Sequence, residues 1–146
     1  MLKANPDVWD VEGALASRRD LDTWRLAPSY RVELVRPGHP CVLWVTGTGV
    51  GAARAGVRAL GVVTTEPFPD VGDPDDPAWR DRAAARVERP YIGVSLDVLD
   101  RPLTRAEVRA DPRLEALEVL RRPRMGSPLA VTDGELAAMR QLAVSR

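Results

Sequence analysis

Cys41-Val42-Leu43-Trp44-Val45-Thr46 is the stretch of sequence that decides the fold. It is almost entirely apolar, rich in β-branched and aromatic residues, and as long as one strand, so it predicts a buried strand. The glycine-rich segment 46–51 that follows lacks a Gly-Lys-Ser/Thr ending, so we interpret it as a hairpin loop and not as a phosphate loop. A second β run extends from Gly56 to Thr65, and its Gly61 predicts a bulge or a sharp bend.

Upstream of these two strands the sequence predicts shorter elements. Leu2–Ala4 predicts a short strand, and Asp10 predicts the cap of a helix over residues 11–18. Residues 20–29 have no clean period and predict an irregular connection. Alternating apolar and polar residues over 30–35 predict a strand or an extended approach to one.

Downstream, the chain first becomes rich in proline and aspartate. Residues 66–81 therefore predict an exposed loop, in which Phe68 and Trp79 are the large anchors. A third β region is expected within residues 84–99, where the alternation predicts that three side chains point inward: Val94, Leu96 and Val98.

Short helices are expected toward the C-terminal end. Thr104–Glu107 and Thr132–Glu135 match the capping box, and Asp111-Pro112 is a common helix start. Several strands, one long loop and short helices predict an α+β fold, a small mixed, strongly bent β-barrel with short peripheral helices. A doubly wound sheet would alternate long helices with strands. We expect one domain over residues 1–146.

The composition excludes several classes of protein. A net charge of zero argues against a protein that coats nucleic acid through phosphate neutralisation alone. The apolar runs are far shorter than the roughly 20 residues that span a bilayer, and the first residues lack the apolar region of a secretory signal. We therefore expect a cytoplasmic protein that has no membrane partner.

Catalytic and metal-binding patterns are missing from the sequence. Cys41 is the only cysteine and His39 the only histidine, which excludes an internal disulfide and a multi-cysteine zinc site. Gly38-His39-Pro40-Cys41 is better explained as a turn that enters a strand than as a catalytic dyad. We expect no enzymatic activity, no catalytic residue, no metal and no cofactor.

Five segments, in this order, resemble the EVE domain family of the PUA-like superfamily. They are residues 2–10, Trp24, residues 36–39 before the strand, residues 56–63 and residues 124–132. The similarity covers nearly the whole chain. It implies a PUA-like barrel that recognises a modified, for example methylated, base in DNA or RNA, flipped into an aromatic-walled pocket.

A flipped base needs flat walls for stacking and polar groups for its edge. Trp24 and Trp9 lie in connecting segments and are candidate walls, although each also fits a core role. Trp44 is a core residue or lines the barrel mouth. The candidate groups for the base edge, each of which also fits turn capping, are Asn5, Ser29, Thr46, Ser127 and the backbone of Gly47.

Arginine clusters are candidates for phosphate contact. The densest is formed by Arg121, Arg122 and Arg124. A second contains Arg18-Arg19 with Arg25 and Arg31. Either cluster also fits an ordinary solvated surface.

Three functions remain open at this point. The first is a reader of modified bases, for which Trp24→Ala is expected to abolish base-dependent binding while the fold survives. The second is a protein-interaction or oligomerisation domain with no base-binding activity. The third is a small-ligand or enzymatic role in the same cavity, because fold alone does not determine function.

Overall fold

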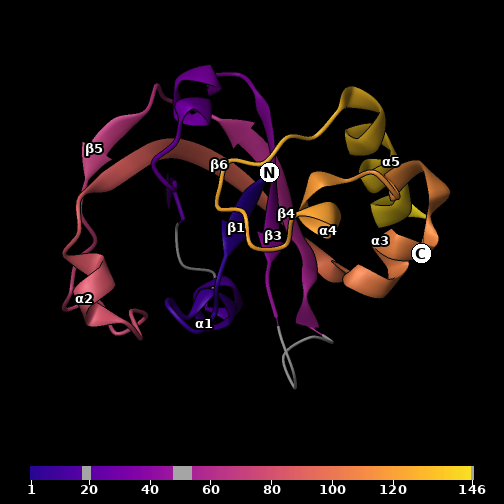
Figure 1. Cartoon of the computed structure of the whole chain (residues 1–146). Helices are drawn as coiled ribbons and strands as arrows, with labels where there is room; N and C mark the ends of the chain where they lie inside the picture. Colours follow the sequence, from indigo (N-terminus) through magenta and orange to yellow (C-terminus); the bar gives the residue numbers. More distant parts are fainter. Residues whose placement is uncertain (18–20, 48–53, 146) are drawn as a thin grey trace.

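The computed structural model describes residues 1–17, 21–47 and 54–145, and a bent sheet forms its centre (Figure 1). The strands run in the order β1-β3-β4-β6-β2, and β5 pairs with β6. They are β1 (Leu2–Ala4), β2 (Thr23–Arg25), β3 (Pro40–Val45), β4 (Gly56–Val63), β5 (Phe68–Asp70) and β6 (Arg89–Thr104). The nearly closed, bent sheet with short helices around it confirms the expected α+β barrel.

Short helices connect and flank the strands. Figure 1 shows α3, α4 and α5 grouped on one side, and α2 and β5 on the other. The helices are α1 (Val11–Ala16), α2 (Arg82–Ala85), α3 (Arg105–Ala110), α4 (Glu118–Arg121), α5 (Asp133–Val144) and the 3-10 helices η1 (Tyr30–Leu34) and η3 (Pro112–Leu114). No helix within the described ranges is long and apolar enough to cross a membrane.

The predicted signals for the start of helices are confirmed. Thr104 and Thr132 each form a complete capping box, with Glu107 and Glu135 respectively. Asp10 caps α1 by accepting a hydrogen bond from the backbone N–H of Gly13. Each signal needs only neighbouring residues, so the sequence is sufficient to find it.

The strand β3 separates two hydrophobic clusters because successive side chains of a strand point to opposite faces. Val42 and Trp44 belong to the cluster that also holds α5 residues, such as Met139. Leu43 and Val45 belong to the other cluster, together with Trp24. All six side chains are 7% exposed or less, so β3 is the buried strand that its sequence predicts.

The irregularity of the β4–β6 ladder lies at a position other than Gly61. The pairing of β4 with β6 shifts register between Val57 and Ala59, whereas Gly61 pairs regularly with Leu96, so the bulge predicted at Gly61 was wrong. The missing side chain of Gly61 instead allows β6 to approach β4 closely, since a Cβ at Gly61 would lie 2.1 Å from the Ser95 carbonyl oxygen.

Three other expectations were wrong. Residues 30–34 form a 3-10 helix, because Val32 and Val35, three residues apart, are the side chains that pack against the core. The connection 20–29 contains β2, whose pairing with β6 supplies its hydrogen bonds. Val98 is 51% exposed and does not point inward.

Candidate functional site

Two adjoining cavities lie on the side of the sheet that carries β2. The aromatic cavity, about 420 Å³ in volume, is lined by Trp9, Trp24, Trp79 and Tyr91 among others. The basic cleft, about 710 Å³, is lined by Arg89, Arg124 and the segment 123–127, again among others. Three residues line both: Lys3, Asn5 and Arg25.

The aromatic walls are held by contacts between distant segments. The Trp9 and Trp24 rings meet edge to face, with centroids 6.0 Å apart and an interplanar angle of 88°. Trp9 also forms an antiparallel bridge with Trp79. The Arg25 guanidinium lies 5.2 Å from the ring centre of Trp79 and 5.9 Å from that of Tyr91. Stacking surface and a cation therefore share one cavity.

Backbone pairing explains why these side chains converge. In the β2–β6 ladder Trp24 pairs with Ile92 and Arg25 with Tyr91. The loop that carries Trp79 is tied to the N-terminal segment, because Asp10 N–H donates to the Ala78 carbonyl at 2.7 Å. Each tie joins segments more than sixty residues apart.

Carboxylates also line the aromatic cavity: Asp22, Asp70, Asp73 and Asp76. Some are engaged locally, since Asp73 and Asp76 each accept a hydrogen bond from a backbone N–H two residues on. A ring of acidic groups repels phosphate and accepts hydrogen bonds from amino groups. The cavity interior thus favours a neutral, amino-bearing ring over a phosphate.

The basic cleft has the opposite electrostatic character. Arg25, Arg89 and Arg124 line it, and its wall at 123–127 presents backbone groups. Arg25 donates to the Val87 carbonyl through a terminal nitrogen, while its buried Nε has no hydrogen-bond partner among the described residues. A chain of phosphates fits this cleft better than it fits the aromatic cavity.

Six of the predicted site residues line these cavities. Asn5, Trp9 and Trp24 line the aromatic cavity, and Asn5 also lines the cleft with Thr46, Ser127 and Arg124. Their polar groups also have structural partners. Asn5 Oδ1 accepts from Asp7 N–H at 2.9 Å, Thr46 Oγ1 donates to the Ala4 carbonyl at 3.2 Å, and the buried Ser127 Oγ accepts from Lys3 N–H at 2.7 Å.

The other predicted base-binding residues line neither cavity. Ser29 caps η1 by accepting from Arg31 N–H. The Gly47 carbonyl accepts from Arg105 Nη2 at 2.9 Å. Trp44 is 2% exposed and lies in the hydrophobic cluster that also contains Met139 of α5. Its role is therefore packing, and it does not line the candidate site.

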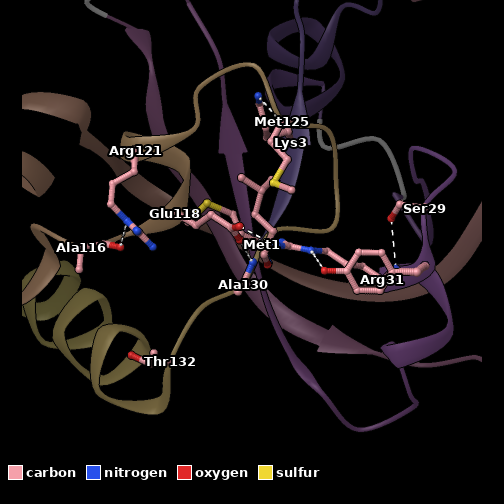
Figure 2. A network of polar contacts seen from close by, with 12 residues as sticks. Met1, Lys3, Ser29, Arg31, Ala116, Glu118, Arg121, Met125, Ala130 and Thr132 are labelled. Carbon is pink, nitrogen blue, oxygen red and sulfur yellow. Dashed lines mark hydrogen bonds and ion pairs between the residues drawn. The ribbon is translucent and has the colours of Figure 1, made fainter.

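The basic cluster predicted to bind phosphate is divided in space. Arg124 lines the cleft, Arg122 is exposed outside it, and Arg121 donates through Nε to the Ala116 carbonyl at 2.8 Å (Figure 2). In the second cluster, Arg18 and Arg19 fall outside the described residues. Of the three arginines of the first cluster, Arg124 is the one that lines the cleft.

Arg31, from the second cluster, has a structural role. Its guanidinium forms a bidentate ion pair with the buried Glu118, with N–O distances of 2.7 and 2.8 Å (Figure 2). Glu118 also accepts from Ala130 N–H at 2.5 Å. The Arg31 ion pair, aided by the Ala130 bond, lowers the pKa of Glu118 to about 2. The network fastens η1 to α4 and to the segment before α5.

Sequence reasoning missed Trp79 as a cavity wall, treating it as a loop anchor. It also missed the placement of Lys3 and Arg89 in the cleft. The proportion of tryptophan, four against one phenylalanine, was the available signal. The long-range bridge to Trp9 is what brings Trp79 to the cavity.

Cys41 and His39 are not arranged as a catalytic dyad. Cys41 is buried, and burial raises the pKa of its thiol to about 11. His39 Nδ1 accepts a hydrogen bond from Arg36 N–H at 3.2 Å within its turn. Across the part of the chain that the structure describes, no cluster of three or more His, Cys, Asp or Glu side chains could hold a metal ion.

Comparisons with known proteins identify the fold. The family model described as the EVE domain matches residues 1–142. A Pseudomonas putida protein is 16% identical, with a TM-score of 0.70 over 99% of this chain and 98% of that one. Human THYN1 protein in complex with DNA that contains 5-methylcytosine is 14% identical, with a TM-score of 0.66 over 99% and 96% of the two chains. Comparison with curated proteins gave no match.

Proposed function

Because this chain belongs to the EVE domain family, we propose that it binds nucleic acid, DNA or RNA, and recognises a modified base. The observation that carries the proposal is the pairing of an aromatic cavity with a basic cleft through three shared residues. The similar human protein in complex with DNA that contains 5-methylcytosine supports a methylated base as the ligand class.

In the proposed complex the base enters the aromatic cavity. Its volume of about 420 Å³ lies within the range of roughly 300–1,000 Å³ typical of small-ligand pockets. Trp9 and Trp79 supply flat surface, and Trp24, which also lines the cavity, holds Trp9 through their edge-to-face contact. Carboxylates that line the cavity accept from exocyclic amino groups, which favours cytosine or adenine derivatives.

The sugar–phosphate backbone occupies the basic cleft. Arg89 and Arg124 there provide local positive charge on a chain whose net charge is zero. The four carboxylates of the aromatic cavity keep phosphates out of it. Separation of charge between the two cavities thus orients the nucleotide.

We further propose that the domain reads the base and does not react with it. The buried thiol of Cys41 and the turn-bound imidazole of His39 offer no nucleophile at either cavity. Binding energy then comes from stacking and desolvation.

The test is titration of intrinsic tryptophan fluorescence with short oligonucleotides, single- and double-stranded, that carry plain, methylated or hydroxymethylated bases. The proposal expects quenching that depends on the modification. Arg124→Gln is expected to weaken binding of every oligonucleotide, whereas Arg109→Gln, an exposed cation on α3 outside both cavities, is the matched control. Absence of any response to all oligonucleotides would overturn the proposal and favour a protein-interaction domain.

A further inference from the structure

Lys3 is the sole lysine of a chain whose lysines and arginines total 21. It lies in β1, is partly buried, and is one of the three residues that line both cavities. Every other side-chain cation near the site is an arginine. The occurrence of lysine at this position therefore calls for a geometric reason.

The contacts of Lys3 supply that reason. Its ammonium donates to the carbonyls of Pro123, at 2.6 Å, and Met125, at 2.8 Å; Figure 2 shows the Lys3 side chain beside Met125. Its backbone N–H donates to Ser127 Oγ, and its carbonyl accepts from Trp24 Nε1 at 3.3 Å. One residue thus holds the wall of the basic cleft and orients an aromatic ring of the neighbouring cavity.

The ammonium has one further donor. A lysine carries three N–H groups arranged tetrahedrally, and two of them serve the wall. An arginine guanidinium holds its five donors in one plane at the end of a longer side chain, so it would not reproduce this compact tetrahedral arrangement at the two carbonyls. The third N–H is therefore carried by a residue, Lys3, that lines both cavities.

We propose that this third N–H of Lys3 contacts a phosphate oxygen of the bound nucleotide, next to the base, while the other two fix the cleft wall at 123–127. The inference rests on the proposed function. A nucleotide whose base fills the aromatic cavity and whose strand follows the basic cleft must place its sugar–phosphate joint where the cavities meet. The cations at that junction are Lys3 and Arg25.

Selective chemistry at the only lysine tests the contact. Reductive methylation with formaldehyde modifies amines, and tandem mass spectrometry separates Lys3 from the α-amino group of the chain. Burial lowers the pKa of Lys3, which increases the reactive unprotonated fraction. A saturating oligonucleotide with 5-methylcytosine is expected to slow methylation of Lys3 roughly tenfold or more, in line with the strength of a charge-assisted hydrogen bond.

Two variants separate the phosphate contact from the wall. Lys3→Met is expected to reduce the slope of log affinity against log salt by about 1, the change expected for one lost phosphate contact. It is also expected to speed hydrogen exchange at residues 123–127 in the free protein. Lys3→Arg is expected to restore the salt slope but not the exchange protection. Arg109→Met is expected to change neither quantity.

The outcomes are distinguishable. Slower methylation together with the reduced salt slope supports the inference. If an oligonucleotide binds, as fluorescence reports, but Lys3 reacts at an unchanged rate and the salt slope of Lys3→Met is that of the parent, the inference is overturned and the proposed function stands. If no oligonucleotide binds the parent protein, both are overturned.

Discussion

The guanidinium of Arg25 lies 5.2 Å from the ring centre of Trp79, although the two residues are on different elements, β2 and the loop after β5. Such a contact is worth roughly 0.5–2 kcal/mol. It presents the indole as a fixed wall before any ligand arrives. Trp79 therefore lines the aromatic cavity and also anchors its loop.

Trp79→Ala is expected to weaken binding of a modified oligonucleotide by roughly ten- to a hundredfold, because stacking of one base on one aromatic ring contributes about 1–3 kcal/mol. The fold is expected to survive, since Trp79 is only partly buried. Fluorescence anisotropy of a labelled oligonucleotide measures the first effect, and circular dichroism the second.

Trp24→Ala is the informative contrast. Trp24 is 7% exposed and belongs to a core cluster, so its truncation is expected to cost about 3–5 kcal/mol of folding free energy. This expectation replaces the one based on sequence, that the fold would survive. Urea denaturation measures it, and an unchanged midpoint would show that Trp24 is not part of the core.

Gly72 makes room for the Trp79 ring. A Cβ at this position would lie 2.5 Å from a ring carbon of Trp79, so Gly72→Ala is expected to displace the indole and weaken binding several-fold. Gly134→Ala in α5 is the control, since nothing lies within 4 Å of its added Cβ. The control is expected to raise stability by about 0.5–1 kcal/mol and to bind as the parent does. Equal affinities for both variants would contradict the assignment of Trp79 to the cavity.

Stability is expected to fall in acid through Glu118. Its folded-state pKa of about 2 lies below the ordinary value of 4.5, so the unfolded chain takes up this proton first. The stabilisation by the Arg31 pair is complete above about pH 4.5 and is lost as the pH falls toward 2. Thermal melts across this range measure the loss.

Glu118→Gln tests the same ion pair directly. It leaves the partly buried Arg31 without its counter-charge and is expected to lower the unfolding free energy at neutral pH. The exposed Glu115→Gln is the matched control and is expected to change the unfolding free energy by less than about 0.5 kcal/mol. A similar acid transition in Glu118→Gln and the parent would assign the acid sensitivity to other groups.

Cys41 is expected to resist thiol reagents in the folded protein. It is 5% exposed, and burial raises its pKa to about 11, so very little thiolate is present at neutral pH. Ellman's reagent is expected to react quickly only after unfolding in denaturant. Rapid reaction of the native protein would show that β3 opens readily.

Much of the fold can be predicted from local sequence. The wrong predictions share one cause, which is pairing between segments far apart in the chain. The buried strand β3 and the capping boxes at Thr104 and Thr132 depend on neighbouring residues alone. The strand β2 is only three residues long and exists because Trp24 pairs with Ile92 in β6. No window along the sequence contains both partners.

The residues of the candidate site also divide into those that the sequence predicts and those that it does not. Trp9, Trp24 and Asn5 were predicted through family resemblance and the known needs of a flipped base, and all three line the aromatic cavity. Trp79 and Lys3 were missed in these roles because their partners, Trp9 and the carbonyls at 123 and 125, lie far away in sequence. Trp44 was considered because its residue type fits stacking, but its place on β3 turns it toward the helices.

The bond between Lys3 N–H and Ser127 Oγ joins residues 124 positions apart, which has a consequence for the order in which the molecule is made. During synthesis the N-terminal part emerges first, so β1 waits until residue 127 has left the ribosome before this wall of the cleft can close. Closing so long a loop is entropically costly and slow compared with forming a local turn. A nascent chain stalled before residue 123 would already contain Trp9, Trp24 and Trp79, yet it would have no competent cleft.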